Sequence, residues 1–187
     1  MILIFFNDFL SQDKGLSTHN ATAIVTTFGI GAACGSIVGG FIGQAMYNTR
    51  PRLLPIILGT STIISTLPAY YLINTELHDS QIIFPCVIAF IFGMLSSPAG
   101  NNIRAILMNV NAPETRGSVF ALFNLTDDLG KGFGPVLASG MNVQFGRTKS
   151  FNYAISCWLL SGCCIAMISC TLLEDYDRLQ KKLQAAK

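Results

Sequence analysis

Long stretches without a charged residue dominate this chain and limit what it can fold into. Four of them match or exceed the roughly 20 residues that a helix needs to cross a bilayer: residues 20–49, 53–75, 80–103 and 150–173. A fifth stretch, residues 117–146, is interrupted only by Asp127, Asp128 and Lys131. Charged residues make up 12% of the chain, about half the usual share, so a water-soluble protein would lack polar surface to cover these segments. The sequence therefore predicts an all-α, polytopic membrane bundle.

The predicted transmembrane bundle occupies residues 1–173, and residues 174–187 form a tail. Its connections are short, so neighbouring helices are expected to run antiparallel. The first ten residues, MILIFFNDFL, are too short to span and lack the basic region and cleavage site of a signal peptide. We expect them to be the end of a transmembrane helix; a segment on the membrane surface is the alternative. The expected spans are residues 1–10 (partial), 20–46, 53–74, 81–108, 116–141 and 150–173.

Basic residues are divided unevenly between the two ends of these spans. One set of ends carries Lys14, Arg147 and Lys149, and the other carries Arg50, Arg52, Arg104, Arg116, Arg178, Lys181, Lys182 and Lys187. Because loops rich in Lys and Arg stay on the cytoplasmic side, the larger set and the C-terminal tail are expected in the cytoplasm. The net charge of +2 is too small to indicate a nucleic-acid partner.

The charged residues in the fifth stretch lie deep in the expected membrane. Counted from Arg116 at about 1.5 Å per residue, Asp127 is roughly 16 Å along the helix, near the midplane. Each charge there costs on the order of 3 kcal/mol, and such residues almost always face the bundle interior or a watery cavity. On a helix they share an arc of about 100°, formed by Asn124, Asp127, Asp128, Lys131 and Pro135. One face of this helix is therefore expected to meet water or a substrate.

Lys131 can neutralise only one of the two carboxylates. Asp127 and Lys131 are spaced i,i+4, and Asp128 is three residues before the same lysine. The second carboxylate must find a partner elsewhere, bind a cation or take up a proton, since desolvation raises the pKa of a carboxyl group. Two interpretations remain: a structural ion pair with a neighbouring helix, or a role in substrate binding and proton coupling.

Glycine and asparagine mark two further helices. Three overlapping GxxxG steps, formed by Gly31, Gly35, Gly39 and Gly43, predict a helix that packs closely against another. In the 81–108 span, Pro98 weakens the helix beside Asn101 and Asn102. Broken helices next to polar groups are where transporters often place binding sites, although a simple packed kink would fit as well.

The chain carries no pattern typical of an enzyme. Neither His19 nor His78 pairs with a candidate nucleophile, and both lie in expected outer loops. The six cysteines have no CxxC spacing and lie inside apolar stretches, where we expect buried, inert thiols. We therefore predict no catalytic activity, no metal site and no cofactor.

These motifs, taken in order, resemble the C-terminal six-helix half of major facilitator superfamily transporters. GGFIGQAMYNTRPR is similar to the loop motif between the second and third helices of each half, with Gly39, Gly43, Arg50 and Arg52 in place and Gln44 where the family has an acid. APETRGSVFAL resembles the turn between the fourth and fifth helices, which contributes Glu114, Arg116 and Gly117. LFNLTDDLGKGFGPVLA is further similar to the spinster-like branch.

The resemblance covers the whole chain and implies both a fold and a site. Residues 1–10 would end the first helix of the half, and an N-terminal half of the same transporter would be missing. The helices that carry Asn101, Asn102 and the charged arc would line the central cavity. The family's cytoplasmic gate would comprise Gly39, Gly43, Arg50, Arg52, Arg104, Glu114, Arg116 and Gly117.

The sequence therefore predicts a multi-pass secondary transporter that works by alternating access in a lipid bilayer. Its substrate would be a small organic solute or a lipid-like molecule, with a proton as the coupling ion. The expected pathway residues are Asn101, Asn102, Asn124, Asp127, Asp128 and Lys131. The alternative is a non-transporting membrane scaffold or receptor of the same fold, in which Asp127, Asp128 and Lys131 form a structural ion pair.

Overall fold

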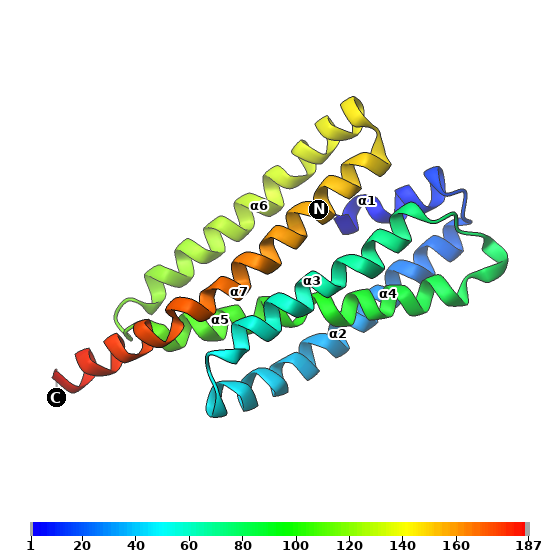
Figure 1. Cartoon of the computed structure of the whole chain (residues 1–187). Coiled ribbons are helices and arrows are strands. Elements are labelled where there is room, and N and C mark those ends of the chain that lie inside the picture. The colour runs from blue at the N-terminus through cyan, green and yellow to red at the C-terminus, as the bar shows by residue number, and fades with distance from the viewer. Residues whose placement is uncertain (1, 186–187) are drawn as a thin grey trace.

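The computed structural model describes residues 2–185 and contains only helices over that range (Figure 1). Residue 1 of the expected partial span and residues 186–187 of the expected tail lie outside it. The elements are α1 (Ile2–Asp8), the π-helical turn η1 (Phe9–Asp13), α2 (Thr18–Thr49), α3 (Leu53–Asn74), the 3-10 turn η2 (Asp79–Gln81), α4 (Ile83–Ser96), α5 (Pro98–Val110), α6 (Arg116–Phe145) and α7 (Arg147–Ala185).

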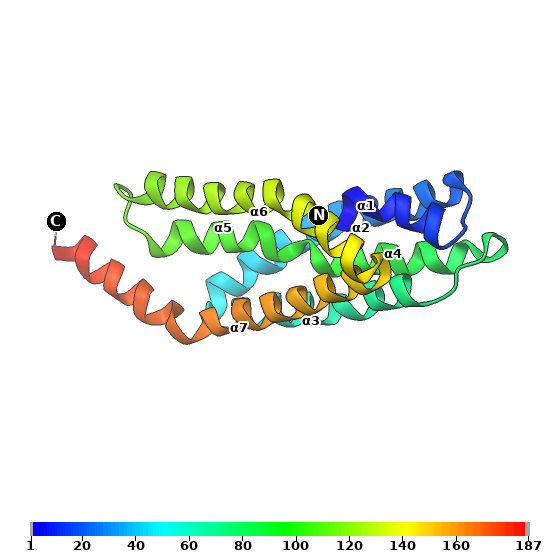
Figure 2. The same ribbon diagram turned by 90° about the horizontal axis from the view of Figure 1, so that it is seen from above.

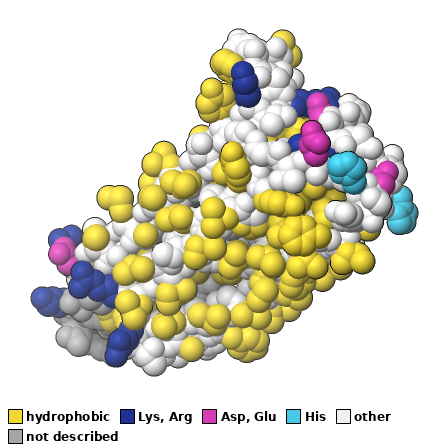
Figure 3. Space-filling view, turned by 45° about the vertical axis from the view of Figure 1, so that its right-hand side comes forward, with side chains coloured by type: hydrophobic (Ala, Val, Ile, Leu, Met, Phe, Trp, Pro, Cys, Tyr) yellow, Lys and Arg dark blue, Asp and Glu magenta, His cyan; other side chains and the backbone are white. Residues whose placement is uncertain are grey.

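Four helical segments are long and apolar enough to cross a membrane: Thr18–Thr49, Leu53–Asn74, Ile83–Val110 and Arg147–Leu172. The helix α6 has 30 residues but carries charges in its middle. Large apolar side chains cover the flanks of the bundle, as Figure 3 shows, and charged residues gather towards its two ends. On α2, for example, Ile37 is 63% exposed and Phe41 is 71% exposed. The expected all-α membrane bundle is confirmed.

The helix over residues 83–110 breaks at Ser97, directly before Pro98. Proline cannot donate a backbone hydrogen bond, and its ring clashes with the preceding turn. The hydroxyl of Ser97 donates to the carbonyl of Ala32 over 2.7 Å and lies 2.5 Å from the hydroxyl of Ser36. Both partners belong to α2, so the break is held against that helix.

The glycine series of α2 lies against α4 and α5. A β-carbon at Gly31 or Gly35 would overlap the backbone of Phe90 or Met94, and one at Gly39 would overlap the ring of Pro98. The absence of side chains on this face of α2 lets the helices approach more closely than larger residues allow. A second close contact, between Gly59 and Gly162, joins α3 to α7.

The helix α7 continues through the expected end of the last span at residue 173. It runs without interruption from Arg147 to Ala185, and Figure 2 shows its end projecting beyond the other helices. The expected boundary at 173 separates an apolar from a polar stretch of one continuous helix, and the part long and apolar enough to cross a membrane is Arg147–Leu172. No Gly or Pro follows Gly162, and Glu174 pairs with Arg178 one turn later over 3.8 Å.

The cysteines differ from the expectation of buried thiols. All six are free; Cys34 and Cys86 are half-buried, and the other four, on α7, are exposed: Cys157, Cys163, Cys164 and Cys170. In a membrane helix, an apolar side chain is as stable facing lipid as facing the core. The position of a cysteine in an apolar stretch therefore does not determine whether its thiol is buried in the bundle.

A polar network joins the elements at one end of the bundle. Arg147 pairs with Asp13 over 2.8 Å, and Lys14 donates to the carbonyl of Thr75 over 3.0 Å. Desolvation by burial lowers the pKa of Lys14. Asp79 accepts from the side chain of Asn20 over 2.7 Å and from the backbone of Ser17 over 3.1 Å, and these bonds lower the pKa of its carboxyl group.

Candidate functional site

The helix α6 is the least covered of the long helices. Of its 30 residues, only Ala138 is buried. It runs along one edge of the bundle, beside α5 and α7 (Figures 1 and 2). The charged arc of α6 is consequently accessible along most of its length, which a membrane protein tolerates only where water or further protein covers the charges.

The charged residues of α6 form a cluster with Arg104 of α5. The ammonium of Lys131 lies 2.7 Å from Asp127 and 3.6 Å from Asp128. The guanidinium of Arg104 lies 3.6 Å from the same oxygen of Asp127. We refer to Arg104, Asp127, Asp128 and Lys131 as the charge cluster.

The guanidinium of Arg104 reaches from α5 to α6. The sequence assigned it to the cytoplasmic gate, whereas the structure points it across to α6, where its guanidinium also lies over the ring of Phe123 at 5.6 Å. Arg104 lies two turns before the end of α5, and the long arginine side chain covers the remaining distance to Asp127. In the sequence, Arg104 lies inside the expected span 81–108. The comparison of basic residues at the two ends of the spans nevertheless assigned it to a span end.

The charge cluster contains two cations and two carboxylates and is therefore neutral. Arg104 supplies a second positive charge from a neighbouring helix, and among the described residues its ion-pair contact within 4 Å is with Asp127 alone. The two carboxylates of the charge cluster are still accessible: 35% of the Asp127 side chain and 73% of the Asp128 side chain are exposed. Asp127 is the centre of the cluster, and Asp128 is the carboxylate that is most open to a ligand.

The three asparagines predicted for the pathway have different environments. Asn102 is buried, and its amide donates to the carbonyl of Gly39 over 3.0 Å and to that of Pro98 over 2.8 Å. Both of its amide hydrogens are thus used to join α5 to α2 and to cap the turn after Pro98. Asn101 and Asn124 are exposed.

The predicted gate residues are not connected to one another in this structure. Arg50 and Arg52 are exposed in the turn between α2 and α3, Glu114 is exposed between α5 and α6, and Gly117 is exposed in the first turn of α6. Arg116 donates to the carbonyl of Asn111 over 3.2 Å and closes its own turn. Among residues 2–185 no ion pair links the two turns. Gly39 and Gly43 are buried packing residues on α2.

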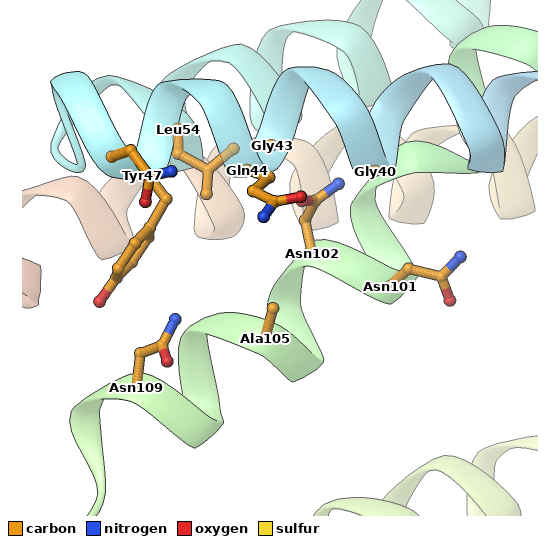
Figure 4. A pocket seen from close by; sticks show the side chains of 10 residues that line it. Gly40, Gly43, Gln44, Tyr47, Leu54, Asn101, Asn102, Ala105 and Asn109 are labelled. Carbon is orange, nitrogen blue, oxygen red and sulfur yellow. The ribbon is translucent and has the colours of Figure 1, made fainter.

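A cavity between α2 and α5 was not predicted from the sequence. It has a volume of about 500 Å³ and is lined by Gly40, Gly43, Gln44, Tyr47, Asn48, Leu54, Asn101, Asn102, Ala105 and Asn109 (Figure 4). The signal that would have revealed it is a spacing of four residues, which places Gln44 and Asn48 on one face of α2 and Asn101 and Asn109 on one face of α5. We refer to it as the amide cavity.

Over the described part of the chain, no three His, Cys, Asp or Glu side chains come close enough together to hold a metal ion.

Comparison with curated proteins and with solved structures gave no match. The family model of the Major Facilitator Superfamily matches residues 1–187, the full length of the sequence.

Proposed function

The chain belongs to the major facilitator superfamily, a family of membrane transporters, and from this premise we propose that it works by alternating access. In this proposal it carries a small organic solute or a lipid-like substrate. The charge cluster lines the pathway, with one carboxylate of α6 as the site of a coupling proton. A second helical unit covers the exposed face of α6 and completes the pathway.

The observation that carries this proposal is an accessible charge cluster in the middle of α6, a 30-residue helix of the membrane bundle. Asp127 lies 11 residues after the start of α6 at Arg116, or roughly 16 Å along a helix axis. Charges at this depth cost on the order of 3 kcal/mol each unless water or opposite charges accompany them. A hydrated passage supplies that water, and a solute that moves along the passage meets the same charges.

Protonation of the cluster would change how α5 and α6 are tied together. With both carboxylates ionised, the cluster is neutral and Arg104 is held by Asp127. A proton on either carboxylate makes the cluster positive and leaves Arg104 and Lys131 to share the remaining anion. The attraction between the two helices weakens, which gives a moving proton a way to bias the packing of α6.

The test is solute uptake into proteoliposomes, over a range of pH, by Asp127→Asn and Asp128→Asn variants of this chain assembled with the second helical unit. Each variant removes one charge but keeps the size and shape of the side chain. Losing a hydrogen bond to a charged group costs 1.5–3 kcal/mol, so we expect uptake to fall about tenfold or more in Asp127→Asn. In Asp128→Asn we expect the pH dependence of uptake to disappear. Asp175→Asn, an exposed change on the end of α7, is the matched control.

Two results would contradict the transport role of the cluster. Normal uptake with unchanged pH dependence in both variants would exclude a coupling role for these carboxylates. Loss of folded protein in both variants, reversed by adding Lys131→Met, would identify the cluster as a structural ion pair and favour the scaffold or receptor alternative.

A further inference from the structure

The amide cavity is separate from the charge cluster and is built from two matching helix faces. On α2, Gly40, Gln44 and Asn48 follow one another at intervals of four residues, and on α5 Asn101, Ala105 and Asn109 do the same. Residues spaced in this way lie on one face of a helix. The space exists because Gly40, at one end of the α2 row, and Ala105, in the middle of the α5 row, bring almost no side-chain volume to these faces.

Unused hydrogen-bonding groups surround this space. Figure 4 shows Gln44 and Asn109 pointing into the gap between α2 and α5 from opposite sides. Each amide side chain offers two donors and a carbonyl acceptor. The hydroxyl of Tyr47 is buried, with the side-chain amide of Asn109 as its hydrogen-bonding neighbour. Polar groups in a membrane protein that lack internal partners are expected to meet water or a ligand.

The lining of the amide cavity lacks fixed charge. Among the described residues around it, none is Asp, Glu, Lys, Arg or His. A charged ligand would lose its hydration without gaining a counterion, and that loss is large. An uncharged ligand with several hydroxyl groups avoids this cost, because hydroxyls donate to amide carbonyls and accept from amide N–H groups.

We propose that the amide cavity binds an uncharged polyhydroxylated solute of the chemical class of a monosaccharide or cyclic polyol. This inference rests on the proposed function in one respect, since it names the class of solute that the transporter carries. Gln44, Asn48, Asn101 and Asn109 bind the hydroxyl groups, and Asn102, whose amide hydrogens are occupied, forms part of the wall.

The test is direct binding to the purified chain, measured by calorimetry and by thermal shift. The probes are glucose and myo-inositol, with glucose 6-phosphate and glucuronate as their charged counterparts. Gly40→Leu fills the cavity, and it should fold because a β-carbon at Gly40 meets nothing within 4 Å. Gly29→Leu is the matched control: it lies on the same helix, is equally free of contacts and is distant from the cavity.

We expect saturable binding of an uncharged probe that Gly40→Leu abolishes and Gly29→Leu leaves unchanged. The charged counterparts should not bind. A second variant, Asn109→Leu, should weaken binding about fivefold through the loss of one hydrogen bond. Binding that persists in Gly40→Leu, equal binding of the charged probes, or no binding of either uncharged probe by folded protein would overturn the proposal.

The same measurement separates this inference from the transport role of the charge cluster. The Asp128→Asn variant should still bind the probe, because Asp128 does not line the amide cavity. Loss of pH-dependent uptake with intact probe binding supports both proposals. Normal coupling in the aspartate variants with intact binding contradicts only the role of the cluster, and absent binding with impaired uptake contradicts only the solute class.

Discussion

Each member of the charge cluster has an opposite charge within 4 Å. Asp127 has two such partners, Lys131 at 2.7 Å and Arg104 at 3.6 Å, and Asp128 has Lys131 at 3.6 Å. For a cluster in the proposed pathway, the sum of the charges matters more than any single pair, because an uncompensated charge loses its hydration. The positive charges of Arg104 and Lys131 together balance the negative charges of the two carboxylates of α6.

This balance predicts the effect of removing Arg104. The Arg104→Leu variant leaves one carboxylate without a counterion, which costs on the order of 3 kcal/mol. We therefore expect a lower thermal unfolding midpoint in detergent. The double variant Arg104→Leu/Asp128→Asn restores neutrality and should recover part of the loss. A double variant no more stable than Arg104→Leu alone would show that charge balance does not determine the stability of this region.

At the scale of the element, α2 carries two kinds of glycine. One row, Gly31, Gly35, Gly39 and Gly43, packs against the backbone and side chains of α4 and α5. The other two glycines of this helix, Gly29 and Gly40, have open space where a side chain would lie. Glycine lowers the stability of a helix by about 1 kcal/mol relative to alanine, so only the first row has a packing reason for that loss.

The contrast predicts opposite effects of the same substitution on one helix. In Gly35→Ala the new methyl group meets the backbone of Met94, and α2 and α4 must separate. Overpacking of this kind costs about 1–3 kcal/mol, so the thermal unfolding midpoint should fall. In Gly29→Ala nothing lies within 4 Å, and the gain in helix propensity should keep the midpoint or raise it. Equal losses in both variants would contradict close packing as the role of Gly35.

At the scale of the whole molecule, the two ends of the bundle differ in how their charges are used. At the end formed by η1 and the start of α7, Asp13 pairs with Arg147, and Asp79 accepts a hydrogen bond from the backbone of Ser17, the N-cap residue of α2. At the opposite end, Arg50 and Arg52 are exposed. Free basic residues favour the cytoplasmic side of a membrane, so this end is expected to face the cytoplasm.

Labelling with a membrane-impermeant maleimide tests this orientation. We expect Ser80→Cys to react in sealed vesicles that expose the outer face, and Thr49→Cys to react only after permeabilisation. Both positions are exposed, at opposite ends of the bundle. The unsubstituted protein, which keeps all six native cysteines, is the control for labelling at those positions. The reverse order of labelling would invert the predicted topology.

The class of the protein was determined by the sequence alone. The charge-free stretches, the break before Pro98 and the glycine spacing are local patterns, and each acts through the membrane or through its own helix. These patterns can be recognised in the sequence without knowing which helices pack together, because hydrocarbon requires every backbone polar group to be satisfied within its own helix. The family could be inferred for the same reason, since its motifs are continuous pieces of chain.

Only the tertiary structure decided which polar side chains meet. The pairing of Arg104 with Asp127, the use of Asn102 as a packing residue and the amide cavity all depend on the rotation and register of α5 against α2 and α6. A shift of α5 by one residue turns its side chains by about 100° and would separate these groups. That register results from packing summed over the whole bundle, and no local stretch of sequence contains it.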